Sequence, residues 1–297
     1  MKKNPLWKII RERKLARFFR KKKLRDIRHA TKKMMHDLRD GAIDFYDYLQ
    51  DNTWSKGEFY IMKTTTKLTL SKPTIQILKN FSAINSNLLI RPGNRLVTMS
   101  SYKNIVAEAM VEETFEQEFG IWDLSQFLGI ITLFEQPELE FHDKYMEISN
   151  ESGSSVKYFY CEPKLITSQP PKALNMPASV LEFSLTEKKL QELQKASSVL
   201  QVSDMSIYAE DGEVFAKVCD TKDNTTNSYS ISLGSTEDCL DSDYGDDFEF
   251  RLKMENLKLI PGSYDVQVGS KVITKFTSKN LNLTYWIALE SGSKTGE

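Results

Sequence analysis

The stretch SKPTIQILKNFSAIN, residues 71–85, decides how the body of this chain is interpreted. Ser71 is a residue type that caps helix N-termini, and Pro73 falls in the first turn, where proline is tolerated. Apolar side chains then recur at helical spacing, so the stretch predicts one amphipathic helix. The preceding residues 64–70, TTTKLTL, alternate with period two and predict a strand.

The same order recurs in the second half of the chain. Residues 179–185, SVLEFSL, predict a strand, and residues 186–200, TEKKLQELQKASSVL, predict a helix capped by Thr186. Short strand patterns follow each helix, and each series contains a further short helix, at 122–134 and at 254–260. The sequence therefore predicts an α+β fold of two similar domains, whose helices use one face for their own sheet and leave the other free.

Domain boundaries follow from composition. Residues 166–178, ITSQPPKALNMPA, contain three prolines and predict an extended connector. We expect domains at 62–168 and 179–297, with the connector at 169–178 and a separate extension at 1–61.

The extension carries an unusual charge. The segment Lys2–Lys33 holds 15 Lys and Arg residues against two acids. Residues 1–61 contain 17 basic and 8 acidic residues, whereas residues 62–297 contain 23 basic and 33 acidic ones. Asn4 is a candidate N-cap and Gly41 follows the last periodic residues, so a long basic helix is expected between them. The asymmetry indicates a basic arm on an acidic body.

Several function classes are disfavoured by the sequence. No apolar run has the roughly 20 residues that a membrane span needs, and the N-terminus does not resemble a secretory signal. Three cysteines without a CxxC pair, and three scattered histidines, argue against structural zinc and indicate a reducing intracellular compartment. No Walker loop, GxSxG or HExxH occurs. We expect a protein that is not an enzyme and binds no cofactor, metal or membrane.

One short motif resembles a metal site. Tyr244-Gly245-Asp246-Asp247 looks like the metal-binding turn of template-dependent polymerases, and paired carboxylates can hold Mg²⁺. A polymerase needs a third carboxylate and far more chain, and Asp and Gly are common turn residues. We expect a hairpin turn here.

The free helix faces are basic although the body is acidic. For any one lysine, a solvated surface is the commoner explanation, but the same sign recurs on helices of both units. A basic lining suits sequence-independent contact with a phosphate backbone. The candidate DNA-binding residues, on or around the first, third and fourth helices of the body, are Lys72, Lys79, Lys188, Lys189, Lys195, Arg251, Lys253 and Lys258.

Five segments then resemble a known family. LSKPTIQILKNFSAINS, WDLSQFLGIITL, KKLQELQKASSVLQV, MENLKLIPGSYDV and YWIALES look like matching segments of the DNA polymerase sliding clamp of T-even-type bacteriophages, in order from about Leu68 to Ser291. The resemblance implies a ring of three protomers, with helices lining a central hole and sheets outside. Such a ring encircles duplex DNA, is opened by an ATP-driven clamp loader, tethers the phage DNA polymerase and supports late transcription. It would work in the cytoplasm of the infected bacterial host.

The resemblance also bears on single residues. Lys79, Lys195 and Lys258 stand where the family has basic helix residues, whereas Lys188 and Lys253 rest on the helical-face argument alone. Partners of such clamps insert a short hydrophobic peptide into an apolar pocket near the connector. Plain core packing is the alternative for the residues that we nominate, by position, as its walls: Val106, Leu174, Met176, Pro177 and Trp286.

The extension departs from the family, and three interpretations stay open. In the first interpretation, the extension is translated from an upstream start and Met62 is the authentic initiator. In the second, it is a basic appendage that contacts DNA or RNA. In the third, it docks a partner protein. Residues 43–50, IDFYDYLQ, resemble the clamp-binding tails of phage polymerase and late transcription factors, with a solvated amphipathic segment as the alternative. The peptide residues are Phe45, Tyr46, Tyr48 and Leu49. A competing function is a basic-arm DNA-binding regulator whose body is an oligomerisation scaffold.

Overall fold

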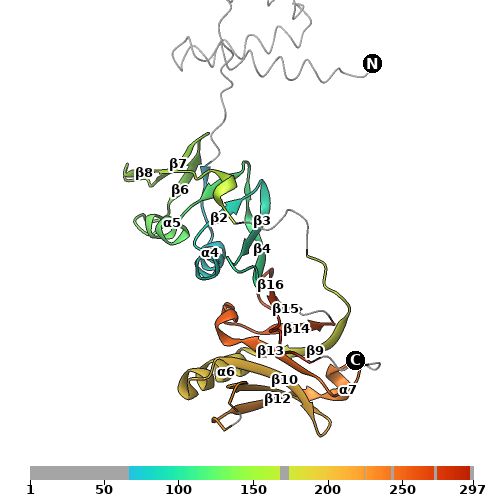
Figure 1. Ribbon diagram of the computed structural model, residues 1–297. Helices are drawn as coiled ribbons and strands as arrows, with labels where there is room; N and C mark the ends of the chain where they lie inside the picture. The colour runs from blue at the N-terminus through green and yellow to red at the C-terminus, as the bar shows by residue number, and fades with distance from the viewer. Residues whose placement is uncertain (1–66, 168–173, 224, 242–243, 271–272, 295–297) are drawn as a thin grey trace, which may run out of the picture. The chain divides into compact units, whose positions relative to one another are not determined.

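The computed structural model in Figure 1 describes residues 67–167, 174–223, 225–241, 244–270 and 273–294. The expected helix of the extension lies outside these residues. So do Phe45, Tyr46, Tyr48 and Leu49, which remain sequence predictions.

The first half of the body alternates short strands with two helices. In chain order its elements are β1 (Lys67–Leu68), α4 (Lys72–Ile84), β2 (Leu88–Ile90), β3 (Gly93–Met99), β4 (Ile105–Phe115), β5 (Phe119–Ile121), α5 (Leu124–Ile131), β6 (Glu138–Phe141), β7 (Tyr145–Ser149), β8 (Ser155–Phe159) and the 3₁₀ turn η1 (Pro163–Leu165). The strand β5 was not expected, because three residues are too few to display a period.

The second half repeats this order with small changes. Its elements are β9 (Ser179–Leu185), α6 (Glu187–Leu200), β10 (Asp204–Glu210), β11 (Glu213–Cys219), β12 (Tyr229–Ser235), α7 (Thr236–Cys239), β13 (Glu249–Lys253), the 3₁₀ turn η2 (Met254–Asn256), β14 (Tyr264–Gly269), β15 (Ile273–Ser278) and β16 (Leu283–Ala288). The predicted α+β class and the repeated strand–helix–strands order are confirmed. The short helix α7 was not expected, and where a short helix was expected at 254–260 the chain forms only the 3₁₀ turn η2.

The two long helices begin at the predicted caps. The hydroxyl of Ser71 accepts a hydrogen bond from the backbone N–H of Thr74, and that of Thr186 accepts one from Lys189. Glu113 of β4 also holds the start of α4, since its carboxylate accepts 2.5 Å hydrogen bonds from the backbone N–H of Ser71 and the hydroxyl of Thr74. Burial alone would raise the pKa of Glu113, but these hydrogen bonds bring it below its usual value.

A six-stranded sheet joins the two halves. Its strand order is β3-β4-β16-β15-β14-β9, so two strands of the first half continue a four-stranded set of the second. At the seam β4 pairs antiparallel with β16, with Val106 opposite Trp286. The other sheets have the orders β1-β6-β7-β8, β12-β11-β10-β13 and β2-β5.

The helices pack on one face of the sheets. In Figure 1, α6 lies across the β10–β12 sheet, and its residues Leu190 and Leu193 are buried in the main core. In the first half, Leu78 and Phe81 of α4 enter the same core. Because side chains alternate along a strand, the opposite face of each sheet points away from these helices.

Polar side chains reinforce the seam between β4 and β16. Asn80 of α4 donates from Nδ2 to the carbonyl oxygen of Lys258, 2.8 Å away, and accepts from the hydroxyl of Tyr285 at 2.9 Å. Lys258 donates from Nζ to the carbonyl oxygen of Ala83, 2.6 Å away. We call Asn80, Lys258 and Tyr285 the polar lock, because they tie the first long helix to the second half of the chain.

Candidate functional site

The helix lysines are accessible, as the sequence predicted. Lys72 and Lys79 are exposed on α4, and Lys188 and Lys195 are exposed on α6, whereas Lys189 is half-buried. Both helices direct their apolar side chains into the core, so these amines lie on the side away from the sheets. The Nζ atom of Lys188 lies 3.9 Å from a carboxylate oxygen of Glu192, a loose pair that leaves the amine open to solvent.

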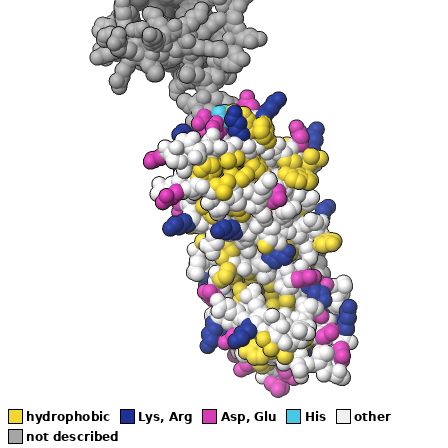
Figure 2. Space-filling model, turned by 90° about the vertical axis from the view of Figure 1, so that its left-hand side faces the viewer, with side chains coloured by type: hydrophobic (Ala, Val, Ile, Leu, Met, Phe, Trp, Pro, Cys, Tyr) yellow, Lys and Arg dark blue, Asp and Glu magenta, His cyan; other side chains and the backbone are white. Residues whose placement is uncertain are grey.

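Charge on this side is dispersed. The left-hand side of Figure 1, where α5 and α6 lie, faces the viewer in Figure 2, and Lys and Arg side chains are spread over it among acidic ones. Scattered amines make separate phosphate contacts, each weak and screened by salt. Such a surface suits loose contact with a polyanion better than tight, sequence-specific docking.

Lys258 has a second role that sequence did not predict. Its side chain is exposed, yet its amine bonds the carbonyl oxygen of Ala83 in the last turn of α4. A cation is favourable at this position, because the C-terminal end of a helix carries partial negative charge. Lys258 is therefore a structural member of the polar lock, and the hydrogen bond to Ala83 makes its amine less available to a phosphate.

Arg251 and Lys253 were expected with the helix cations, around a fourth helix, and this placement is wrong. Both lie on the strand β13, where Phe250 and Leu252 enter the core and the alternating residues point to the other face. The core that Phe250 and Leu252 enter also receives α6, so Arg251 and Lys253 lie on the face opposite that helix. We leave them out of the candidate DNA-facing set.

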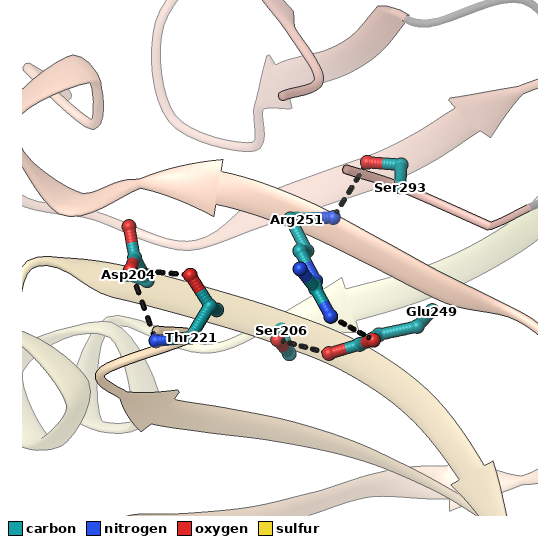
Figure 3. A network of polar contacts seen from close by, with 6 residues as sticks. All are labelled: Asp204, Ser206, Thr221, Glu249, Arg251 and Ser293. Atoms are coloured by element: carbon teal, nitrogen blue, oxygen red, sulfur yellow. Dashed lines mark hydrogen bonds and ion pairs between the residues drawn. The ribbon is translucent and has the colours of Figure 1, made fainter. Parts of the chain in front are cut away.

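Both misplaced cations are also paired: Arg251 within the network shown in Figure 3, and Lys253 with Asp204, another residue of that network. Arg251 donates to a carboxylate oxygen of Glu249 at 2.6 Å, and the hydroxyl of Ser206 donates to the other oxygen at 2.8 Å. The backbone N–H of Arg251 donates to the hydroxyl oxygen of Ser293, which fastens the C-terminal segment to β13. These contacts indicate a structural role.

Asp204 anchors the other end of the network. Its carboxylate accepts 2.7 Å and 3.2 Å hydrogen bonds from the hydroxyl and backbone N–H of Thr221, and it pairs with Lys253. Burial alone would raise the pKa of Asp204, but Lys253 and Thr221 bring it below its usual value. The group is therefore a buried anion held by its neighbours.

A small apolar cluster occupies the face of the six-stranded sheet away from the main core. Three of the five residues nominated for a partner pocket meet there, namely Val106 of β4, Trp286 of β16 and Leu174 of the connector. Met176 lies farther along the connector, against Gly269 of β14, and Pro177 is half-buried beside it. We call the residues Val97, Met99, Val106, Leu174, Ile273 and Trp286 the outer cluster.

Sequence reasoning missed three members of the outer cluster. Val97 and Met99 are two residues apart on β3, and Ile273 begins β15. The alternation along β3 placed Val97 and Met99 on one face, but nothing local indicated that this face lies next to Trp286. The missing information was the β3-β4-β16-β15 strand order.

The indole of Trp286 gives the outer cluster a polar feature. Trp286 is only 7% exposed, and its Nε1–H finds no acceptor within the described part of the chain. Directly across the β15–β16 pair lies Lys275, whose amine is 3.2 Å from the side-chain oxygen of Gln267. An unsatisfied buried donor is costly, so a ligand that supplies an acceptor here would gain affinity. The cluster thus suits a short apolar peptide that also offers a carbonyl or carboxylate oxygen.

Among the described residues no group of three or more His, Cys, Asp or Glu side chains is arranged to hold a metal ion. Tyr244 to Asp247 lie in an irregular segment between α7 and β13, and the expected hairpin turn is wrong, because β12 and β13 are not neighbours in their sheet. Within the same residues, no helix combines the length and apolar character needed to cross a membrane.

Comparisons with known proteins agree with this geometry. A family model described as DNA polymerase processivity factor matches residues 70–168, and one described as gp45 sliding clamp, C terminal, matches residues 182–291. The chain belongs to the phage sliding-clamp family. Residues 1–61 of this clamp lie outside both matches.

Curated relatives of the clamp are sliding clamps of bacteriophages. The sliding clamp of Vibrio phage KVP40 is 30% identical over 75% of this chain and 99% of the relative. That of Escherichia phage RB69 is 31% identical over 75% of this chain and 97% of the relative. The recognition made from the five sequence segments is confirmed.

Solved structures show the same fold at low identity. The H. pylori beta clamp in complex with diflunisal has a TM-score of 0.57 and 14% identity, covering 79% of this chain and 69% of the other. The A. fulgidus PCNA bound to the C-terminal region of FEN-1 has a TM-score of 0.55 and 10% identity, covering 77% and 99%. The predicted clamp fold is therefore confirmed.

Proposed function

We propose that this clamp forms a homotrimeric ring around duplex DNA and slides along it without reading sequence. The observation that carries the proposal is the recurrence of exposed lysines on the free faces of α4 and α6, the equivalent helices of the two halves. Lys72, Lys79, Lys188 and Lys195 supply contacts that are separate and weak, as sliding requires. Residues 62–297 as a whole are acidic, which disfavours DNA on other surfaces.

We further propose that the ring tethers the phage DNA polymerase and supports late transcription. The outer cluster is the docking surface in this proposal, since it combines apolar side chains with the unsatisfied indole N–H of Trp286. A related fold, A. fulgidus PCNA, has been solved with a bound C-terminal region of FEN-1. An ATP-driven loader opens the ring, and the complex works in the cytoplasm of the infected bacterial host.

Retention on DNA tests the ring. The clamp, a loader and ATP are incubated with nicked circular DNA, free protein is removed by gel filtration, and the DNA is then cut once. We expect retention on the circle and loss after the cut, because an encircling protein leaves only over a free end. Equal retention before and after cutting would contradict encirclement.

The charged extension supports a second candidate, a regulator that binds DNA through residues 1–61 while the body only oligomerises. With 17 basic and 8 acidic residues, that segment could bind DNA by charge alone. This candidate predicts that a chain starting at Met62 loses DNA retention, whereas the ring predicts that retention on circles persists. The two outcomes are mutually exclusive in the same assay.

A further inference from the structure

A row of side chains crosses the six-stranded sheet on the face away from the main core. The antiparallel registers place its members directly opposite one another, strand by strand, in the order Met99, Val106, Trp286, Lys275, Gln267 and Glu182. Side chains that lie directly opposite on neighbouring strands share one face of the sheet. The first three belong to the outer cluster, so this cross-strand row runs from apolar side chains to an indole, then to a cation and an amide.

Two adjacent donors of the cross-strand row lack an anion. The Nζ atom of Lys275 lies 3.2 Å from the side-chain oxygen of Gln267, a neutral amide, whose nitrogen donates to Glu182 at 2.8 Å. Among the described residues, no carboxylate pairs with Lys275. Beside it, across the β15–β16 pair, lies the buried indole N–H of Trp286, which also lacks a partner within that part of the chain. An ammonium and an N–H side by side suit a carboxylate, because charge-assisted hydrogen bonds are the strong ones.

The acids next to the cross-strand row are already neutralised. Glu108 lies two residues after Val106 on β4, and its carboxylate pairs with Arg95 at 2.7 Å. Asp265 of β14 pairs with Lys279 at 2.8 Å. Because side chains alternate along a strand, both acids share the face of the row. Their pairing with other cations leaves the two donors of the row to an incoming anion.

The extension contains a segment with complementary chemistry. Residues 40–55 hold four acids and no Lys or Arg, although residues 1–61 as a whole hold 17 basic residues. Within this stretch, residues 43–50 interleave carboxylates with large apolar side chains, in the order Asp44, Phe45, Tyr46, Asp47, Tyr48 and Leu49. An apolar side chain directly beside a carboxylate is the combination that the outer cluster and its two neighbouring donors would bind.

The covalent tether between this segment and the body is short. Residues 51–66 separate it from Lys67, where the described part of the chain begins. Sixteen residues span at most roughly 55 Å when fully extended. Such a tether keeps the segment at a high effective concentration for any surface within its reach, so even a weak contact is well populated.

We propose that residues 43–50 bind to the outer cluster, with a carboxylate of Asp44 or Asp47 between the indole N–H of Trp286 and the amine of Lys275. The clamp thus carries its own competitor for the surface on which partner peptides dock, and a partner has to displace it. The inference rests on the proposed docking surface and deepens it, because it names what regulates access to that surface.

Competition in the full-length chain tests whether the segment occupies the site. A fluorescent peptide with the sequence of residues 40–55 is titrated into the wild type and into Phe45→Glu/Tyr48→Glu, and anisotropy gives the dissociation constant. The peptide should bind the variant about tenfold more tightly or better, because the tethered segment no longer competes. Phe18→Glu/Phe19→Glu makes the same change of charge outside the segment and should bind the peptide as the wild type does.

Substitutions in the cross-strand row test where the peptide binds. In the Phe45→Glu/Tyr48→Glu chain, Lys275→Gln and Trp286→Phe should each raise the dissociation constant about tenfold or more, since each removes a donor to a carboxylate. Lys164→Gln, at an exposed lysine outside the row, is the control and should change nothing. Circular dichroism verifies that each variant is folded.

A double-mutant cycle tests the carboxylate contact itself. A peptide in which Asp44 and Asp47 are both replaced by asparagine should bind the Phe45→Glu/Tyr48→Glu chain about tenfold more weakly or worse. Lys275→Gln should then cause little further loss, because the two changes remove the same interaction. Independent, multiplicative losses would overturn this contact.

The outcomes separate this inference from the proposed function. Equal affinity of the peptide for the wild type and for Phe45→Glu/Tyr48→Glu would overturn occupancy by the segment. If the 40–55 peptide does not bind, but a peptide from the polymerase C-terminus binds and is weakened by Leu174→Glu, the inference is overturned and the docking surface stands. If Leu174→Glu affects neither peptide, both are overturned.

Discussion

The hydroxyl group of Tyr285 donates a hydrogen bond to Oδ1 of Asn80 across 2.9 Å, although 205 residues separate the two in sequence. The oxygen of that hydroxyl accepts from the backbone N–H of Ile260 at 3.2 Å. Burial raises the pKa of Tyr285 above its ordinary value, so the hydroxyl stays protonated and available as a donor. One phenol thus joins a helix of the first half to a strand and a loop of the second.

Removing that hydroxyl should destabilise the clamp. Tyr285→Phe leaves the Asn80 oxygen and the Ile260 N–H without this partner in a buried site, which costs about 1–3 kcal/mol for each group left unsatisfied. Because two groups lose a partner, chemical denaturation should show a free energy of unfolding that is lower by about 2–6 kcal/mol. Tyr102→Phe, at a side chain that is 92% exposed, is the matched control and should change stability by less than about 0.5 kcal/mol.

Reversing the helix charges should weaken the hold on DNA without breaking the ring. In Lys79→Glu/Lys195→Glu, two exposed amines become carboxylates, and the salt slope of binding should fall by about one unit for each phosphate that is no longer neutralised. The amount of clamp loaded onto nicked circles at increasing salt is the measurement, because a ring that already encircles a circle leaves only over a free end; light scattering verifies the trimer. Lys258 is excluded because its amine also bonds Ala83.

The control for this experiment makes the same charge reversal at two other positions. Lys164→Glu/Lys222→Glu changes two exposed lysines that lie outside α4 and α6, so the net charge is matched. If both double variants load equally poorly, the helix faces have no special role and total charge governs binding.

A charge in the outer cluster should block partner peptides. Leu174→Glu places a carboxylate among Val106, Trp286 and their neighbours, where it has to be desolvated when a peptide docks. We expect the dissociation constant of a fluorescent peptide from the polymerase C-terminus to rise about tenfold or more. The trimer should persist, and Leu165→Glu, at an exposed leucine outside the cluster, should bind as the wild type does. If the Leu174→Glu variant binds the peptide as tightly as the wild type does, the docking site does not lie in the outer cluster.

Acid should destabilise the clamp partly through Asp204. Its pKa is lower in the folded chain than in the unfolded one, so the unfolded state binds more protons and stability rises with pH across that interval. The contribution is complete above the unfolded value of about 4 and is lost as pH falls through the folded value. The measurement is thermal unfolding of the wild type and of Asp204→Asn, from pH 7 down to the lowest pH at which the wild type is still folded. The variant should be less stable at neutral pH, and its loss of stability on acidification should be smaller. Parallel pH curves for the two proteins would show that Asp204 titrates equally in both states.

Local patterns predicted most elements, because their signals lie within a few residues. The caps Ser71 and Thr186, with apolar side chains at helical spacing, marked the starts of α4 and α6. The strand at Ser179–Leu185 coincides with the predicted segment. Each of these elements shows its period over its own length.

The features that the sequence did not reveal depend on which strands lie next to each other in a sheet. Arg251 and Lys253 share a face by alternation, but that this face carries Ser206 and Asp204 follows only from pairing with β10. The polar lock likewise joins Asn80 to residues more than 170 positions away. Of the candidate partner residues, Val106 and Trp286 were nominated by position in the family, and their cross-strand pairing on β4 and β16 was not predicted.

The seam between β4 and β16 has a consequence for synthesis of the protein. On the ribosome β4 emerges long before β16, and at about 5–20 residues per second the delay is on the order of 10 s or more. During that interval the edge of β4 that later receives β16 has no strand from its own chain to pair with. An unpaired edge invites association with other nascent chains, so rapid translation of the second half, or a chaperone that shields β4, should raise the yield of folded protein.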